Sequence, residues 1–146
     1  MGNIIIDEMT LKDYNVLKNT LQTEFDEFWT PEILKSELEN QNSKYIVAFI
    51  DDEIVGFAGI TYNFDYIEIM NIVVKNNMRR KGIAASLMKK LILLSEEYNV
   101  NKIALEVNEN NIPARKMYEK FGFKEVGIRK NYYNGNSDAI LMDFYL

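Results

Sequence analysis

The sequence contains no cysteine and no histidine. Without cysteine there is no disulfide, no thiolate nucleophile and no zinc cluster held by thiolates. Without histidine there is no Ser-His-Asp triad, no imidazole base and no histidine-ligated metal. Proton transfer at an active site must therefore use carboxyl, amine or phenol groups, the backbone or water. We expect no metal site, and the lack of cysteine fits a cytoplasmic protein.

Long apolar runs are also missing, and none reaches the ~18 residues that suggest a membrane-spanning helix. Residues 1–10 lack the positive flank and the cleavage site of a signal peptide, so we expect no membrane association. The 146 residues, 47% of them hydrophobic, predict one domain spanning residues 1–146. A net charge of −5 argues against direct nucleic-acid binding, because phosphate contacts dominate such affinity. That charge fits a cationic substrate and, equally, a need for solubility.

The period of the apolar residues changes several times along the chain. Alternation and β-branched runs predict strands over residues 3–9, 44–50, 54–62, 66–74, 102–107, 124–133 and 138–145. Helical spacing predicts helices over 11–22 after Thr10, from Thr30-Pro31 onward, from Gly82 to a left-handed Asn99, and over 112–121. Turns at 51–53 and at Asn134-Gly135-Asn136-Ser137 indicate hairpins. This order predicts an α+β (α/β/α) fold, a mixed and mostly antiparallel sheet of six or seven strands flanked by about four helices.

The segment Arg79-Arg80-Lys81-Gly82-Ile83-Ala84 lies where a predicted strand has ended and a long helix begins. The N-terminus of a helix presents unpaired N–H groups and about half a positive charge, so it attracts anions. Gly82 allows close approach of a ligand to the backbone, and three adjacent cations add charge. The Lys-Ser/Thr pair of a nucleotide-Mg²⁺ loop is absent, so the pattern favours a diphosphate cradle over a hydrolytic nucleotide site.

The same six residues match Arg/Gln-x-x-Gly-x-Gly/Ala, and here the chain resembles the GCN5-related N-acetyltransferase (GNAT) family. Later residues are similar to the ribosomal-protein alanine N-acetyltransferase (RimI-type) branch, notably Leu105-Glu106-Val107, Asn111, Tyr118, Arg129 and Tyr132-Tyr133. Phe28-Trp29-Thr30 is similar to the branch's Pro-Trp-Ser. Asn108 and Lys75-Asn76 depart from the branch's usual residues.

The resemblance implies a site for acetyl-CoA and assigns residues to it. A bulged strand with Ile72, Val73 and Val74 would bind the pantetheine arm and polarise the thioester carbonyl. Arg79, Arg80, Lys81, Gly82, Ile83, Ala84 and Ala85 would hold the diphosphate. Asn111 would contact the cofactor, although capping of the helix that follows it explains this residue equally well. Trp29, Tyr132 and Tyr133 would bind the substrate, and alternation allows at most one of the two tyrosines to face the cofactor.

Glu106 and Tyr118 are implied as base and acid, and the chemistry of the reaction supports these residue types. The chain has no thiol for an acyl-enzyme, so direct transfer in a ternary complex is the simplest route. At pH 7 a neutral α-amine is favoured over a neutral lysine by roughly 300-fold, so a modest base suffices for the α-amine. A glutamate at its ordinary pKa of ~4.3 still lies below the α-ammonium at ~8, so Glu106 needs a raised pKa or a bridging water. A tyrosine at ~10 is matched to a leaving thiolate.

These residues are compatible with three functions. The first is acetylation of a protein N-terminal α-amine, with a ribosomal protein as the family's substrate. The second keeps acetyl-CoA and transfers to a lysine or a small-molecule amine. The third is a non-catalytic acyl-CoA-binding module that retains the fold. The sequence leaves the oligomeric state open between monomer and weak dimer.

Overall fold

The computed structural model describes residues 2–133 and 137–146, with only the backbone described at Tyr133. Seven strands form one sheet in the order β1-β2-β3-β4-β5-β7-β6, in which only the β4–β5 pair is parallel. The strands are β1 (Ile5–Glu8), β2 (Ser43–Ile50), β3 (Glu53–Tyr62), β4 (Ile67–Val74), β5 (Lys102–Asn108), β6 (Lys124–Tyr133) and β7 (Ser137–Tyr145). The predicted mixed, mostly antiparallel sheet is confirmed.

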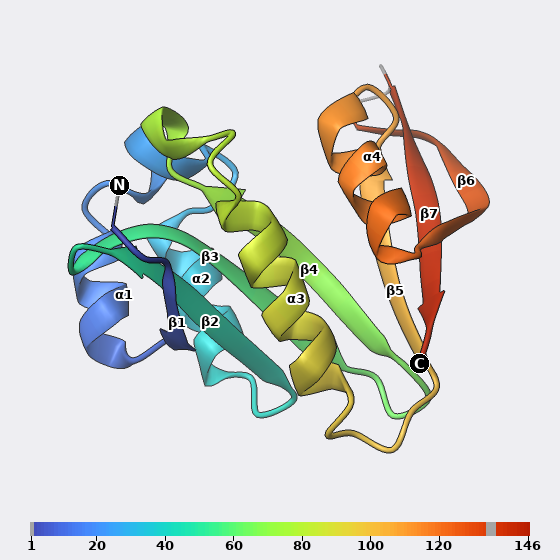
Figure 1. The fold of residues 1–146 in the computed structure, drawn as a ribbon, viewed down its shortest axis with the longest axis horizontal. Helices are drawn as coiled ribbons and strands as arrows, with labels where there is room; N and C mark the ends of the chain where they lie inside the picture. The colour runs from blue at the N-terminus through green and yellow to red at the C-terminus, as the bar shows by residue number, and fades with distance from the viewer. Residues whose placement is uncertain (1, 134–136) are drawn as a thin grey trace.

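Four α-helices in the described residues cover the two faces of this sheet (Figure 1). They are α1 (Leu11–Leu17), α2 (Pro31–Glu39), α3 (Ile83–Ser95) and α4 (Ile112–Phe121). Helices α3 and α4 lie on one face, where Leu87, Leu91 and Tyr118 join the larger core cluster. Helices α1 and α2 lie on the other face, around Leu17 and Trp29. The predicted α/β/α layering is therefore confirmed.

Two predicted helix ends differ from the structure. The helix predicted over 11–22 ends at Leu17, and a π-helical turn, η1 (Leu21–Phe25), follows it. Leu17, Leu21 and Phe25 are all buried, so the apolar spacing of four continues across the break and conceals it. Asn99 is not the left-handed cap of α3. That helix ends at Ser95, and bonds from Glu97 N to Leu94 O and Tyr98 N to Ser95 O satisfy its last carbonyls.

The pairing of β4 determines the shape of the middle of the sheet. Ala58 pairs with Ile72 and Ile60 with Ile69, so two residues of β4, Met70 and Asn71, oppose the single Gly59. This is the bulge that the family resemblance implied. On its other side β4 pairs with β5 only through Ile67–Ile103 and Glu68–Ala104, and the two strands then diverge (Figure 1). The rest of β4 therefore has a strand partner on one side only within the described residues.

Gly59, opposite the bulge, makes room for a buried aromatic ring. A Cβ at Gly59 would lie 2.3 Å from Cζ of Tyr45, whose hydroxyl donates a 3.0 Å hydrogen bond to Glu37 Oε1. The Tyr45 ring is 2% exposed and cannot move into solvent. We expect Gly59→Ala to lower the free energy of unfolding by about 1–3 kcal/mol, measured by urea denaturation, because overpacking displaces the ring.

Gly127→Ala is the matched control for Gly59→Ala. Its Cβ would meet Leu141 Cδ1 at 3.2 Å, and the end of a leucine side chain can move. The expected loss of stability is well below that of Gly59→Ala. Equal losses in the two variants would contradict the packing role given to the Tyr45 ring.

Candidate functional site

The loop before α3 adopts an unusual backbone conformation. Arg80 has φ +63° and Gly82, the N-cap of α3, has φ +81°. A left-handed arginine costs of order 1–3 kcal/mol, and such strain gathers at ligand-binding turns. Thr10, Thr30 and Asn111 cap α1, α2 and α4 with their side chains, whereas no side chain of the described residues caps α3. The first turn of α3 therefore offers unpaired N–H groups to a ligand.

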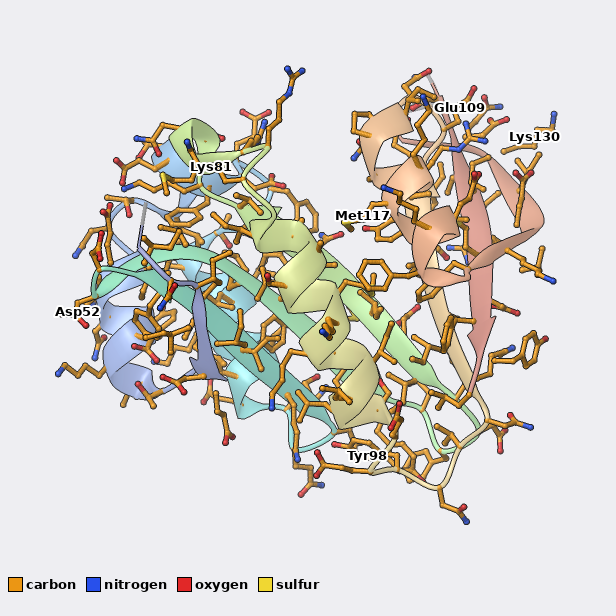
Figure 2. All side chains as sticks on the ribbon, viewed as in Figure 1. Asp52, Lys81, Tyr98, Glu109, Met117 and Lys130 are labelled. Atoms are coloured by element: carbon orange, nitrogen blue, oxygen red, sulfur yellow. The ribbon has the colours of Figure 1, made fainter. Side chains whose placement is uncertain are left out.

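The space around this turn is compatible with a phosphate group. A Cβ built on Gly82 meets nothing within 4 Å, and Arg80 and Lys81 are exposed. Lys81 lies at the end of the molecule where α3 begins (Figure 2). Ile83 is 1% exposed, so only its backbone can face a ligand, while Ala84 and Ala85 are partly exposed. Arg79 donates a 3.0 Å hydrogen bond from Nη2 to Asn76 Oδ1 and so braces the loop.

Strand β4 brings backbone polar groups toward this turn. Ile72 and Val74 pack partly buried on the α3–α4 side, whereas Val73 is buried on the α1–α2 side. Because the ladder with β5 stops at Glu68, the β5-facing edge of this segment can pair with an extended ligand. A pantetheine arm, with two amide groups, is such a ligand.

Helix α4 places Tyr118 on the same side of the sheet as α3. Tyr118 is 8% exposed, joins the core cluster that contains Leu105 and Val107, and lies 5.9 Å from the Phe123 ring between centroids. At the start of α4, Asn111 Oδ1 accepts a 3.3 Å hydrogen bond from Ala114 N. Asn111 is thus the helix cap, the simpler of the two roles predicted for it, and its contact with a cofactor stays a prediction.

Glu106 lies on the opposite side of β5 from Tyr118. Leu105 and Val107 point into the α3–α4 core, so strand alternation turns Glu106 to the α1–α2 side. There Glu106 Oε1 forms an ion pair with Arg129 Nη2 at 2.9 Å. Arg129 also lies over the Tyr132 ring, 4.9 Å from its centroid. The structure therefore joins Glu106 to Tyr132 through Arg129.

Trp29 and the pair Tyr132 and Tyr133 are the predicted substrate contacts. Trp29 is 2% exposed and packs edge-on against Tyr45 and Phe57, so its ring is part of the core, and its contact with a substrate stays a prediction. Its indole Nε1 has no hydrogen-bond partner in the described residues. The side chain of Tyr133 and the turn 134–136 lie outside the described part of the chain. The bulge between Arg129 and Tyr133 breaks the simple alternation on which the prediction for Tyr132 and Tyr133 depended.

The sequence interpretation did not identify two residues of this region. Arg129 appears in the sequence interpretation only as part of a motif. Its ion pair with Glu106 depends on the pairing of both β5 and β6 with β7. Glu68 was missed, although a charged residue inside the otherwise uncharged strand Ile67–Val74 was a visible signal. Burial, and then the charge of Glu106, raise the pKa of the Glu68 carboxyl, while Arg129 acts against them.

Within the described residues no group of side chains is suited to hold a metal ion. No helix in that part of the chain is long and apolar enough to cross a bilayer. A strained turn with unpaired N–H groups, a bulged and half-unpaired β4, and the ionisable side chains of Glu106 and Tyr118 on the two sides of β5 fit an acyl-transferase of the kind that uses a CoA thioester.

Comparisons with known proteins agree with this class. Residues 14–123 match the acetyltransferase (GNAT) family. The chain is 37% identical over 113 residues to the ribosomal protein bS18-alanine N-acetyltransferase of Haemophilus influenzae, covering 73% of this chain and 77% of that protein. It is 33% identical over 139 residues to a Bacillus subtilis protein provisionally named for the same activity, covering 94% and 92%. The crystal structure of the Escherichia coli ribosomal-protein-S18-alanine N-acetyltransferase superposes with a TM-score of 0.87 at 26% identity, covering 98% and 94%.

The chain therefore belongs to the GNAT acetyltransferase family, and it is an N-acetyltransferase by fold and by kinship.

Proposed function

We propose that this enzyme transfers the acetyl group of acetyl-CoA to the N-terminal α-amine of a protein, with an alanine-starting ribosomal protein as acceptor. The relatives named for this activity support the choice of acceptor. The observation that carries the proposal is the placement of Glu106 and Tyr118 on opposite sides of β5, with Glu106 two residues beyond the last residue of β5 that pairs with β4. Such an acceptor would place the enzyme in the cytoplasm. The chain would act as one domain spanning residues 1–146.

The donor would bind on the α3–α4 side. Backbone N–H groups of Gly82–Ala85 and the side chains of Arg80 and Lys81 would hold the diphosphate. The unpaired edge of Ile72–Val74 would hold the pantetheine arm, and Asn111 would complete the site. Bound acetyl-CoA supplies the activated acyl group. Tyr118, on this side, would donate the proton that the leaving sulfur needs.

The acceptor would approach from the α1–α2 side. Glu106 and Arg129 lie there with Tyr132, whose phenol can hydrogen-bond a peptide backbone. With donor and acceptor on two sides of the diverging strands, both can be bound at once. Direct transfer in a ternary complex is then the simplest course, because the chain has no cysteine for an acyl-enzyme.

A peptide panel tests this function. Acetyl-CoA turnover is measured with an alanine-starting peptide, the same peptide with a blocked N-terminus, and a blocked peptide that carries a lysine. We expect turnover with the free N-terminus only, since at pH 7 its neutral form exceeds that of lysine by roughly 300-fold. Equal turnover of the blocked lysine peptide would favour a lysine acetyltransferase. No turnover with any amine would favour a non-catalytic acyl-CoA-binding module.

A further inference from the structure

Strand β6 is irregular near its C-terminal end. Its pairing with β7 shifts by two residues between Arg129 and Tyr133, so three residues of β6 oppose the single Asp138 of β7. The middle one of the three, Asn131, has a left-handed backbone with φ +54°. Asparagine tolerates this conformation better than most residues do. The three residues therefore form a large bulge, a feature that re-aims side chains and gathers next to active sites.

Asp138 bonds to this bulge with its side chain and to a second loop with its backbone. Its Oδ1 accepts a 2.8 Å hydrogen bond from the backbone N of the left-handed Asn131. Its carbonyl oxygen accepts a 3.0 Å hydrogen bond from Glu109 N, and its own N–H donates to Glu109 Oε2. Glu109 follows β5 and lies at the end of the molecule where β7 begins and α4 starts (Figure 2). Asp138 thus joins the bulge to the β5–α4 loop, through a carboxylate that accepts stronger hydrogen bonds than a neutral oxygen.

The bulge brings together two side chains that a regular strand would separate. Residues three apart on a regular strand point to opposite faces of the sheet. Arg129 and Tyr132 are three apart, yet the guanidinium of Arg129 lies over the Tyr132 ring, 4.9 Å from its centroid. The same guanidinium forms the 2.9 Å ion pair with Glu106 Oε1. The shape of the bulge therefore determines where the Tyr132 phenol lies relative to Glu106.

We propose that Asp138 is a positioning residue for the acceptor peptide; this rests on the proposed function. The Asp138 carboxylate holds Asn131 in its left-handed conformation. The bulge then keeps the Tyr132 ring on Arg129, beside Glu106, where the phenol meets the backbone of the peptide. Asp138 acts through these residues and not on the reacting atoms. Because β5 lies between β4 and β7 in the sheet, the proposed donor groups on β4 and α3 are held independently of Asp138.

Steady-state kinetics separate this role from a general loss of stability. In Asp138→Ala the bulge relaxes, so we expect KM for the alanine-starting peptide to rise by about tenfold or more, because a displaced phenol no longer meets the peptide. KM for acetyl-CoA should stay within about twofold of wild type. Asp138→Asn keeps an oxygen acceptor and should recover most of the loss. A wild-type peptide KM in Asp138→Ala would overturn the proposal, and so would an Asp138→Asn variant as impaired as Asp138→Ala.

Asp143→Ala is the matched control, because Asp143 lies on the same strand and also has a partner, Lys102 Nζ at 3.6 Å. This variant should leave both KM values within about twofold of wild type. Circular dichroism checks that each variant is folded. If Asp138→Ala does not fold, Asp138→Glu takes its place, since the longer side chain keeps the charge and displaces the acceptor oxygens from Asn131 N. A peptide KM that rises as much in Asp143→Ala as in the Asp138 variant would contradict the proposal.

NMR tests the bulge without any turnover. The Asn131 amide should exchange with solvent about tenfold faster in Asp138→Ala than in wild type, because its hydrogen bond is lost. The nuclear Overhauser effect between the Tyr132 ring and the Arg129 side chain should disappear in the same variant. If both signals persist in Asp138→Ala, the proposal is wrong even for an active enzyme. If wild type acetylates no peptide while both signals depend on Asp138, the proposed function is at fault and not the hold of Asp138 on the bulge.

Discussion

Replacing Tyr118 with phenylalanine should lower kcat by about 100-fold or more, while the Kd for acetyl-CoA changes by less than about twofold. The variant removes one oxygen from a ring that is 8% exposed, and the aromatic packing against Phe123 remains. Loss of the phenol removes the proton donor that the leaving sulfur would need. The measurements are steady-state kinetics and CoA binding by calorimetry.

Tyr14→Phe is the matched control for Tyr118→Phe. Tyr14 is 7% exposed and donates a 3.0 Å hydrogen bond to Pro31 O, so it also loses a buried phenol. It lies on α1, in the core cluster of the other face. Its removal should reduce stability by about 1 kcal/mol and leave kcat unchanged. A kcat for Tyr118→Phe equal to that of Tyr14→Phe would exclude Tyr118 as the acid.

The parts of the fold that the sequence predicted well are those with local causes. Thr10 and Thr30 cap the helices that they were expected to cap, and the hairpin between β2 and β3 turns at Asp51 and Asp52, both with positive φ. Helix α3 begins directly after Gly82, where the sequence predicted a helix to begin. Each of these features depends on a few neighbouring residues, which a pattern in the sequence can reveal.

The parts that the sequence could not predict depend on which face of the sheet a side chain occupies. Trp29 belongs to the core because Tyr45 and Phe57 come from strands that pair behind it. Glu106 and Tyr118 were expected to act together, and strand parity places them on opposite sides of β5. The ion pair of Glu106 with Arg129 joins residues 23 positions apart in the chain. Such long-range pairing leaves no local signature.

The second large effect is expected at Gly82. Gly82→Glu should weaken CoA binding by about 100-fold, or about 2.7 kcal/mol, measured by calorimetry at constant salt. Its side chain would stand beside the unpaired N–H groups of α3, where it would exclude a diphosphate and repel it. In the protein without ligand the substitution meets no steric obstacle, because nothing lies within 4 Å of the added Cβ. Stability should therefore fall only by the ~1 kcal/mol that a left-handed non-glycine residue costs.

Two further variants separate the causes of the loss at Gly82. Gly82→Asn adds volume without charge and accepts the left-handed backbone, so it should weaken CoA binding by less than Gly82→Glu. Asn77→Glu adds the same charge on the exposed turn η2 (Asn76–Met78), outside the first turn of α3 and five residues before Gly82. Because salt screens exposed charges over about 10 Å, this variant should cost only a few-fold in affinity. If Asn77→Glu weakened CoA binding as much as Gly82→Glu, net charge alone would explain the loss, and the amide groups of α3 would no longer be needed to hold the diphosphate.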